Sequence, residues 1–292
     1  MLLYFIMVCK GVFLEFDGIS EGLDVYNPTA PFTNNNGMYL AARVEPRKSE
    51  TDSKVRFFRK SGTTWKLDEN TPIFSLQDPF LSRIGNQTIF GGVELFYRNN
   101  ELNWRTLFYK GDSIYNLEKF FEGPEGMKDI RLTSLPNKRI GIFTRHQGKI
   151  GRRGNIGYTD CQSLNKIPCL NLEDTPLLED LFDDESWKGA NEVYILEANT
   201  LGILSHEAHM DPSGAKHYSA TCFKFDYLKR RVHNLKVIAT RSDFPDCAAK
   251  RSPGLDDIIF PGGMIIQGKH AELYVGLSDT KAGRIRVPNP FI

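Results

Sequence analysis

A carboxylate near the end of the first third of the chain has the surroundings of a proton donor. Asp78 lies in the run 75–80, directly before Pro79. A residue that precedes proline is disfavoured in helix and favours extended backbone. The apolar, glycine-rich run 89–94 that follows is typical of a buried strand where backbones approach closely. The pattern predicts that Asp78 faces a ligand at a strand entrance, and the alternative is that Asp-Pro only begins a turn.

Strand-like runs recur along the whole chain, while helical periodicity is scarce. Runs of β-branched and aromatic residues alternate with clusters of Gly, Asn, Asp and Pro, which is typical of an all-β protein. Only residues 112–121 and the acidic stretch 171–184 look helical or irregular, and we expect the acidic stretch to lie on the surface. A length of 292 residues suits one large all-β domain, so residues 1–292 are expected to form a single domain.

The strand-like runs group into five units, each of two or three runs followed by a loop. The first unit extends from Val12 to Trp65, and the fifth begins at Lys236. Units slightly longer than the roughly 40–50 residues of a simple blade suit four-stranded propeller blades with long loops. The sequence therefore predicts a five-bladed β-propeller. A sandwich or jelly roll would explain the strands but not their recurring spacing.

Composition describes an ordinary globular protein without a polyanion-binding surface. Hydrophobic residues make up 40%, charged residues 25%, and the net charge is +1, so no nucleic-acid partner is expected. The five cysteines are odd in number and form no C-x-x-C pair, which argues against a disulfide framework and a zinc site. We expect no metal, no cofactor and a cytoplasmic location. The apolar run 1–9 lacks a basic start, is too short to span a bilayer, and favours an opening strand over a processed signal.

A propeller arranges its inner strands around one channel, where a polar pocket is the default site. Polar side chains near the strand-like runs of the five units are therefore candidates. They are Asp24, Asn27, Arg43 and Glu45, then Asp78 and Glu94, then Lys128, Asp129, Arg145 and His146, then His206, Glu207, His209, Lys216, His217 and Tyr218, and finally Asp256, Asp257 and Asp279.

Several short motifs, in consistent order, resemble the β-mannoside phosphorylases and their relatives, which are five-bladed propellers. The resemblance covers nearly the whole chain. The fragment 24–32 is similar to a branch formerly described as a domain of unknown function and linked to β-1,2-mannosyltransferase-phosphorylases. The motifs are residues 27–30, 42–45, 77–79, 128–129, 143–145, 258–263 and 273–280.

The resemblance implies roles for individual residues. Asp78 matches the aspartate of a Glu-Asp-Pro-Arg motif and would be the general acid, although Gln77 and Phe80 replace the flanking residues. Other matching positions would bind substrate: Asn27, Arg43, Glu45, Asp129 and Asp279 the sugar, and Arg145, His206 and Tyr218 the phosphate.

These residues suit phosphorolysis better than hydrolysis. Phosphate is already a nucleophile, whereas an inverting glycosidase needs a carboxylate base as well as an acid. Arg145 can hold phosphate through two parallel hydrogen bonds, with His206, Lys216 and Tyr218 as further donors. The expected partners are a β-linked, most simply β-1,2, manno-oligosaccharide with inorganic phosphate, or a sugar phosphate or nucleotide sugar in the reverse direction.

Two other functions stay open. A hydrolase resembling the arabinan-cleaving propellers would use Asp24 or another aspartate of the first blade as base, and Glu207 of the fourth blade as acid. A non-catalytic glycan-binding propeller would need aromatic platforms but not Asp78, and the candidates are Trp65, Trp104 and Trp187. The cation-rich loop 148–154 lacks the ending of a P-loop, yet it follows Arg145 closely and is a candidate to cover a phosphate group.

Overall fold

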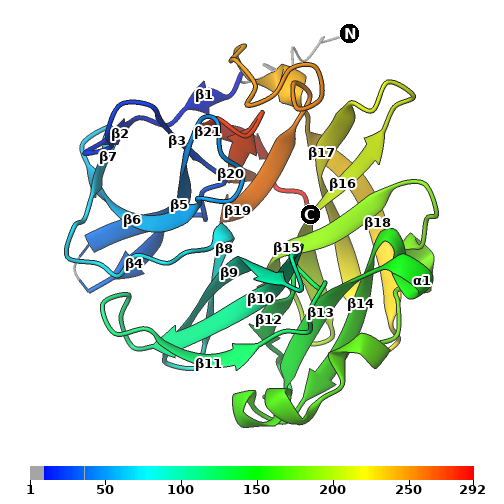
Figure 1. Ribbon diagram of the computed structural model, residues 1–292. Helices are drawn as coiled ribbons and strands as arrows, with labels where there is room; N and C mark the ends of the chain where they lie inside the picture. The colour runs from blue at the N-terminus through cyan, green and yellow to red at the C-terminus, as the bar shows by residue number, and fades with distance from the viewer. Residues whose placement is uncertain (1–9, 36) are drawn as a thin grey trace, which may run out of the picture.

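A computed structural model describes residues 10–35 and 37–292 of the chain. Its strands form five sheets arranged in a ring (Figure 1). The predicted all-β, five-bladed propeller is confirmed. The opening strand expected within residues 1–9 lies outside the described residues.

The first two blades hold the strands between Phe16 and Glu122, and in the second of them consecutive strands are hydrogen-bonded neighbours. All pairs are antiparallel except β2 with β7, which is parallel. The strands are β2 (Phe16–Asp17), β3 (Leu23–Tyr26), β4 (Phe32–Asn34), β5 (Gly37–Pro46), β6 (Lys54–Ser61) and β7 (Thr64–Leu67) in blade 1, and β8 (Gln77–Ile84), β9 (Gln87–Arg98), β10 (Glu101–Gly111) and β11 (Glu118–Glu122) in blade 2.

The remaining blades complete the ring. Blade 3 has three strands, and 3-10 helices follow its last one. The strands are β12 (Arg131–Ser134), β13 (Ile140–Gln147) and β14 (Arg152–Cys161) in blade 3, β15 (Trp187–Ile195), β16 (Thr200–Met210), β17 (Lys216–Asp226) and β18 (Arg231–Ala239) in blade 4, and β19 (Ile259–Gln267), β20 (His270–Leu277), β21 (Lys281–Pro288) and β1 (Val12–Phe13) in blade 5.

Helices are short and lie between strands. Across residues 10–35 and 37–292, every helix falls short of the length and apolar character needed to cross a bilayer. The acidic stretch 171–184 is irregular as predicted, but its Leu172, Leu178 and Leu181 are buried. The stretch 112–121 is only partly irregular, because its last residues belong to β11. The helices are α1 (Gly148–Gly151), η1 (Leu164–Cys169), η2 (Leu172–Asp174), η3 (Glu179–Leu181) and η4 (Arg241–Asp243).

The structure corrects the borders of two predicted units. Val12 was placed in the first unit, but it pairs with Arg284 of β21 and belongs to blade 5. Lys236 was placed in the fifth unit, but it pairs with Cys222 and belongs to blade 4. The physical reason is that the N-terminal strand supplies the outer strand of the last blade, so that β1 lies beside β21 and closes the ring (Figure 1).

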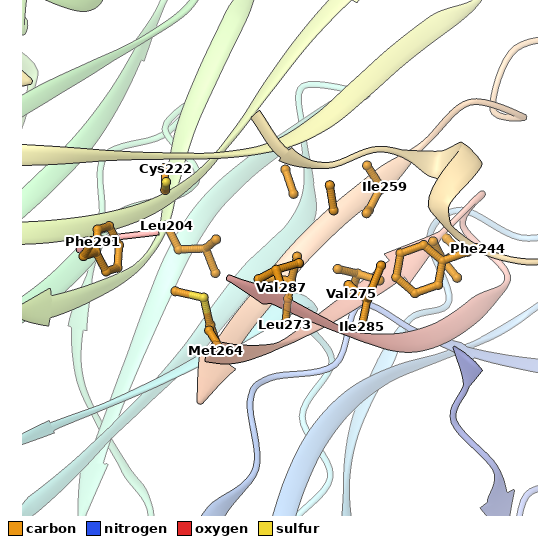
Figure 2. Close-up of a cluster of buried hydrophobic side chains, with 14 residues drawn as sticks. Leu204, Cys222, Phe244, Ile259, Met264, Leu273, Val275, Ile285, Val287 and Phe291 are labelled. Carbon is orange, nitrogen blue, oxygen red and sulfur yellow. The ribbon is translucent and has the colours of Figure 1, made fainter. Parts of the chain in front are cut away.

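Apolar side chains fill the spaces between neighbouring blades. Between blades 4 and 5, Leu204 and Cys222 pack with Ile259, Leu273 and Val275, all within a few per cent of full burial (Figure 2). Such contacts fix the angle between neighbouring sheets, and therefore the position of the inner strands around the channel.

Phe225 packs between blades 3 and 4 and offers a test of this core. It is fully buried, with its ring 4.8 Å from that of Tyr158 and 5.7 Å from that of Phe143. We expect Phe225→Ala to lower the free energy of unfolding by about 3–5 kcal/mol, measured by urea denaturation. Phe182→Ala, at a side chain that is 42% exposed, is the matched control and should change it little. An equal loss of stability in the two variants would contradict the placement of Phe225 in the core.

Candidate functional site

A single small cavity lies where the inner strands meet. In each blade the inner strand pairs antiparallel with its neighbour, and such pairs place Tyr26 beside Arg43 and Gly189 beside His206. The cavity has a volume of about 170 Å³. This is below the roughly 300–1,000 Å³ of most ligand pockets, so it suits one sugar ring better than an oligosaccharide.

Nine of the ten predicted site residues line this cavity. Glu45 is the exception, because it is fully buried behind the wall. The nine are Asn27, Arg43, Asp78, Asp129, Arg145, His206, Lys216, Tyr218 and Asp279.

Four of these side chains are carried by backbone in the left-handed region. Asn27, Asp78, Asp129 and Asp279 have φ values of 47°, 47°, 58° and 55°. The extended conformation predicted for Asp78 is therefore wrong, although the strand β8 around it is present. A bulge at residues 77–80 of β8 turns the carboxylate toward the channel. Left-handed backbone at a non-glycine residue costs about 1–3 kcal/mol and is concentrated at functional sites.

The close backbone approach predicted around Asp78 is confirmed. A side chain at Gly92 would place its Cβ 2.6 Å from the Gln77 carbonyl oxygen. A side chain at Gly276 would place its Cβ 1.7 Å from Oδ1 of Asn27. Because neither position has room for a methyl group, both glycines support the residues at the acid end of the cavity.

Asp78 lies at the centre of a polar group formed by blades 1 and 2. Its Oδ1 accepts a hydrogen bond of 2.7 Å from Nδ2 of Asn27 and one of 3.4 Å from Nη1 of Arg43. The Asp78 side chain keeps 13% of its surface exposed, so it can meet a ligand. Burial opposes the charge of Arg43, but attraction to Asp78 and other groups raises its pKa above the ordinary value.

Glu45 holds Arg43 from behind. Its two carboxylate oxygens accept from Nη2 of Arg43 at 3.1 and 3.0 Å. It also accepts from Ser53, Tyr26 and the ammonium of Lys250. Burial raises the pKa of Glu45, but Arg43 and Lys250 outweigh it and the net shift is downward. Glu45 is thus placed to position a cation rather than to contact a ligand in the cavity.

Asp279 follows β20 and faces Arg43 from blade 5. Burial raises the pKa of its carboxyl group, and the nearby charge of Asp78 adds to the effect against the pull of Arg43. Two carboxyl groups and one guanidinium thus line this end of the cavity, a combination that can accept and donate hydrogen bonds to sugar hydroxyls.

Blades 3 and 4 form a cationic end. Nη1 of Arg145 donates to Oδ2 of Asp129 at 3.1 Å, and both side chains are almost completely buried. Burial raises the pKa of Asp129, but Arg145 above all lowers it to about 2. A side chain at Gly154 of β14 would place its Cβ 2.6 Å from Nε and Nη2 of Arg145, so this glycine leaves room for the guanidinium.

His206 completes this end as a neutral imidazole. Its Nδ1 lies 2.9 Å from Oδ1 of Asn191, and its ring stacks on Tyr218 at 5.8 Å between centroids. Burial lowers the pKa of His206 to about 3, and Arg145 adds to this against the attraction of Asp129. An arriving anion would therefore raise the pKa of the imidazole.

Further donors surround Arg145. Lys128 and Lys216 line the cavity, and within the described chain neither ammonium has a carboxylate within 4.0 Å. Burial lowers the pKa of Lys128, and the charge of Arg145 lowers it further. The hydroxyl of Tyr218 accepts a 3.0 Å hydrogen bond from Nε1 of Trp187, and burial raises its pKa to about 12. The phenol therefore keeps its proton available for donation.

The two carboxylates named for the hydrolase alternative lie elsewhere, and so does one of the three tryptophans named for the glycan-binding alternative. Asp24 forms a two-pronged ion pair with Arg47, and Glu207 pairs with Lys188 at 3.1 Å. Neither lines the cavity. Trp65 is 2% exposed and belongs to the core of blade 1. Residues 10–35 and 37–292 contain no cluster of three or more His, Cys, Asp or Glu arranged to hold a metal ion.

Sequence reasoning missed several lining residues. Tyr26 stacks under the guanidinium of Arg43 at 4.9 Å, and Lys250 reaches Glu45 from the loop before β19. Phe260 packs against the ring of His206, with centroids 5.0 Å apart. The motif 258–263 pointed to the last of these, but no local pattern marked Lys250.

Fold and site together define a class of protein, a five-bladed propeller whose central cavity combines an acidic end with a cationic end. Comparison with known families agrees, since the model described as "Protein of unknown function (DUF1861)" matches residues 6–292. The chain belongs to this family. The comparison with curated proteins finds no match.

Several solved structures are similar to this chain. MPT-4 from Leishmania mexicana, a mannose phosphorylase in complex with phosphate, is 31% identical with a TM-score of 0.89, over 97% of this chain and 89% of that one. MPT-1 from Leishmania mexicana, a GDP-Man-dependent mannosyltransferase, is 31% identical with a TM-score of 0.89, over 98% and 91%. A β-1,2-mannobiose phosphorylase from Listeria innocua shares the fold, at 16% identity, a TM-score of 0.65 and 92% of each chain. The resemblance inferred from the motifs is confirmed.

The neutral state of His206 has a consequence for stability. Its folded pKa, about 3, lies below its ordinary value of 6.5, so the unfolded chain takes up a proton first as the pH falls. We expect the free energy of unfolding to fall between pH 6.5 and pH 4, and to fall by at least about 1 kcal/mol less in His206→Gln. Urea denaturation in phosphate-free buffer at pH 7, 5.5 and 4 measures both. Parallel pH profiles would contradict the assignment.

Proposed function

We propose that this protein transfers mannose between phosphate, or the phosphate of a nucleotide sugar, and a β-1,2-linked manno-oligosaccharide, with inversion at the anomeric carbon. The observation that carries the proposal is the division of one small cavity into an acidic end and a cationic end. The similarity to a mannose phosphorylase and a mannosyltransferase over almost the whole chain supports the same substrate class.

The acidic end would hold the mannose ring and the oxygen that leaves it. Asp78 is the proposed general acid, and it acts directly or through a sugar hydroxyl. Asn27 and Arg43 hold its carboxylate in place through the hydrogen bonds described above. Asp279 would accept hydrogen bonds from sugar hydroxyls at this end, Asp129 would accept them from the cationic end, and Glu45 would act through Arg43.

The cationic end would hold phosphate. Arg145 offers its guanidinium edge, and Lys128, Lys216 and Tyr218 add donors around it. The charge of the anion would offset the like-charge repulsion among these cations, which already lowers the pKa of Lys128. His206 would become a further donor to the phosphate, because a nearby anion favours the protonated imidazole.

In the proposed reaction, a phosphate oxygen attacks the anomeric carbon while the glycosidic C–O bond breaks. The departing oxygen takes the proton of Asp78, and the products are α-mannose 1-phosphate and a glycan one residue shorter. In reverse, an acceptor hydroxyl attacks the sugar, the C–O bond to phosphate breaks, and Asp78 receives the hydroxyl proton. Charge at the anomeric carbon develops as in an oxocarbenium ion in both directions.

Hydrolysis fits the geometry less well. An inverting hydrolase needs a second carboxylate as base, on the face of the sugar opposite the acid. The carboxylate on that side, Asp129, is paired with Arg145 and has a pKa of about 2, so it is a poor base.

The proposed acid can be tested by substitution. Asp78→Asn keeps the shape and the hydrogen bond from Asn27 but removes the proton donor. We expect turnover on an unactivated mannoside to fall by about 10²–10⁴-fold with little change in the unfolding midpoint. Asp279→Asn is the matched variant, and it should raise the Michaelis constant for mannoside more than it lowers turnover. A loss below tenfold in Asp78→Asn would remove Asp78 from this role.

The phosphate site separates this function from hydrolysis. Lysine supplies charge without the guanidinium fork, so Arg145→Lys should raise the apparent constant for phosphate by about tenfold or more and that for mannoside much less. Saturation curves in each substrate measure both constants, and Arg286→Lys on the exposed surface of β21 is the control. If the unaltered protein releases free mannose equally well without phosphate, the hydrolase becomes the better interpretation.

A further inference from the structure

A second, larger cavity adjoins the cationic end of the site. It has a volume of about 690 Å³ and is lined by residues of β10, β13, β14, β15 and α1. It shares four lining residues with the central cavity, and none of them comes from the acidic end. The four are Lys128, Arg145, Lys216 and Tyr218.

The position of this cavity decides which part of a substrate can reach it. In an inverting transfer, the nucleophile and the leaving group lie on opposite sides of the anomeric carbon. Neither Asp78 nor Asp279 lines the second cavity, so it continues from the phosphate side of the sugar. A group attached to the phosphate would extend into it, whereas the glycan would extend away from the acidic end.

Charge in the second cavity favours an anionic occupant over a neutral glycan. Three of its charged residues are ion-paired: Glu125 with Arg98 and Arg152 with Asp184, each at 2.9 Å, and Arg145 with Asp129 at 3.1 Å. The cations Lys128, Lys216 and Arg153 have no carboxylate within 4.0 Å in the described chain. Glu173 is the one other acid among the lining residues.

The second cavity also has aromatic walls and room for a large ligand. Trp104 of β10 and Trp187 of β15 both line the cavity, and the guanidinium of Arg153 lies 5.9 Å from the centre of the Trp187 ring. Indole rings and guanidinium planes are surfaces on which nucleobases stack. A volume of about 690 Å³ lies within the range typical of pockets for ligands of nucleotide size.

We propose that this second cavity binds the nucleoside part of a nucleoside diphosphate, with its terminal phosphate in the Arg145 site. Lys216 and Arg153 contact the inner phosphate, and Trp104 supports the base. This rests on the proposed function, because it takes the phosphate position from it. The loop 148–153 thereby serves as the wall of a nucleotide site, through Gly148, Ile150, Arg152 and Arg153.

The test compares binding of GDP, ADP, UDP and CDP with that of inorganic phosphate, by isothermal titration calorimetry on the whole chain. At least one nucleoside diphosphate should bind about tenfold more tightly than phosphate and should compete with phosphate in phosphorolysis. Arg153→Gln and Trp104→Ala should each weaken that nucleotide by about tenfold, and leave the apparent constant for phosphate within about twofold. Arg153 is exposed, so its variant should fold. Arg286→Gln is the control.

The outcomes separate this proposal from the proposed function. Phosphate-dependent cleavage without tighter or competitive binding of any of the four nucleotides would overturn the nucleotide site and leave the phosphorylase intact. A raised Michaelis constant for mannoside in Trp104→Ala, with nucleotide binding unchanged, would identify a glycan subsite instead. Cleavage that is independent of phosphate would overturn the proposed function itself.

Discussion

The buried pair of Asp129 and Arg145 is the interaction on which the rest of the site depends. Two charges removed from water are tolerated only when they are paired and well oriented, and loss of one partner leaves the other uncompensated. Asp129 turns toward Arg145 on left-handed backbone, and Gly154 leaves the space in which the guanidinium lies. The pair thus fixes a cation at the centre of a propeller without cancelling the donors that face the cavity. His206, packed beside it, stays neutral because burial lowers the pKa of its imidazole and the charge of Arg145 lowers it further, against the attraction of Asp129.

A second group of ion-paired residues forms the acidic end of the cavity. Arg43 touches Asp78 in front and Glu45 behind, and Lys250 supplies Glu45 with a second cation. The outcome is a carboxylate at the cavity surface whose neighbouring cation, Arg43, is itself held in place by Glu45. Because the two ionic groups come from different blades, the acidic end and the cationic end can vary independently. This arrangement suits a family in which a phosphorylase and a nucleotide-sugar-dependent transferase share one fold.

Sequence patterns predicted most of the cavity but not the way its side chains are held. Asp78, Arg145 and Asp279 stand in motifs next to strand ends, and a propeller brings such positions together whatever the loops do. The error at Asp78 has a physical cause, since a bulge and not the local preference before proline decides its backbone. Lys250 could not be predicted, because it reaches Glu45 from a loop about 200 positions away. Lys236 was assigned to blade 5 instead of blade 4, because the alternation of residues in an outer strand does not show to which blade the strand belongs.

Closure of the ring by β1 and β21 has a consequence for how the site assembles. Blades 3 and 4 follow each other in the chain, so the cationic end needs only neighbouring segments. The acidic end joins blades 1, 2 and 5, which meet across the seam where Val12 pairs with Arg284. Contacts so distant in sequence form late, because the chain loses much freedom before they compensate. Of the acidic end, the contributions of Asp279 and Lys250 are therefore expected to form last during folding, and local opening of this seam would remove them first.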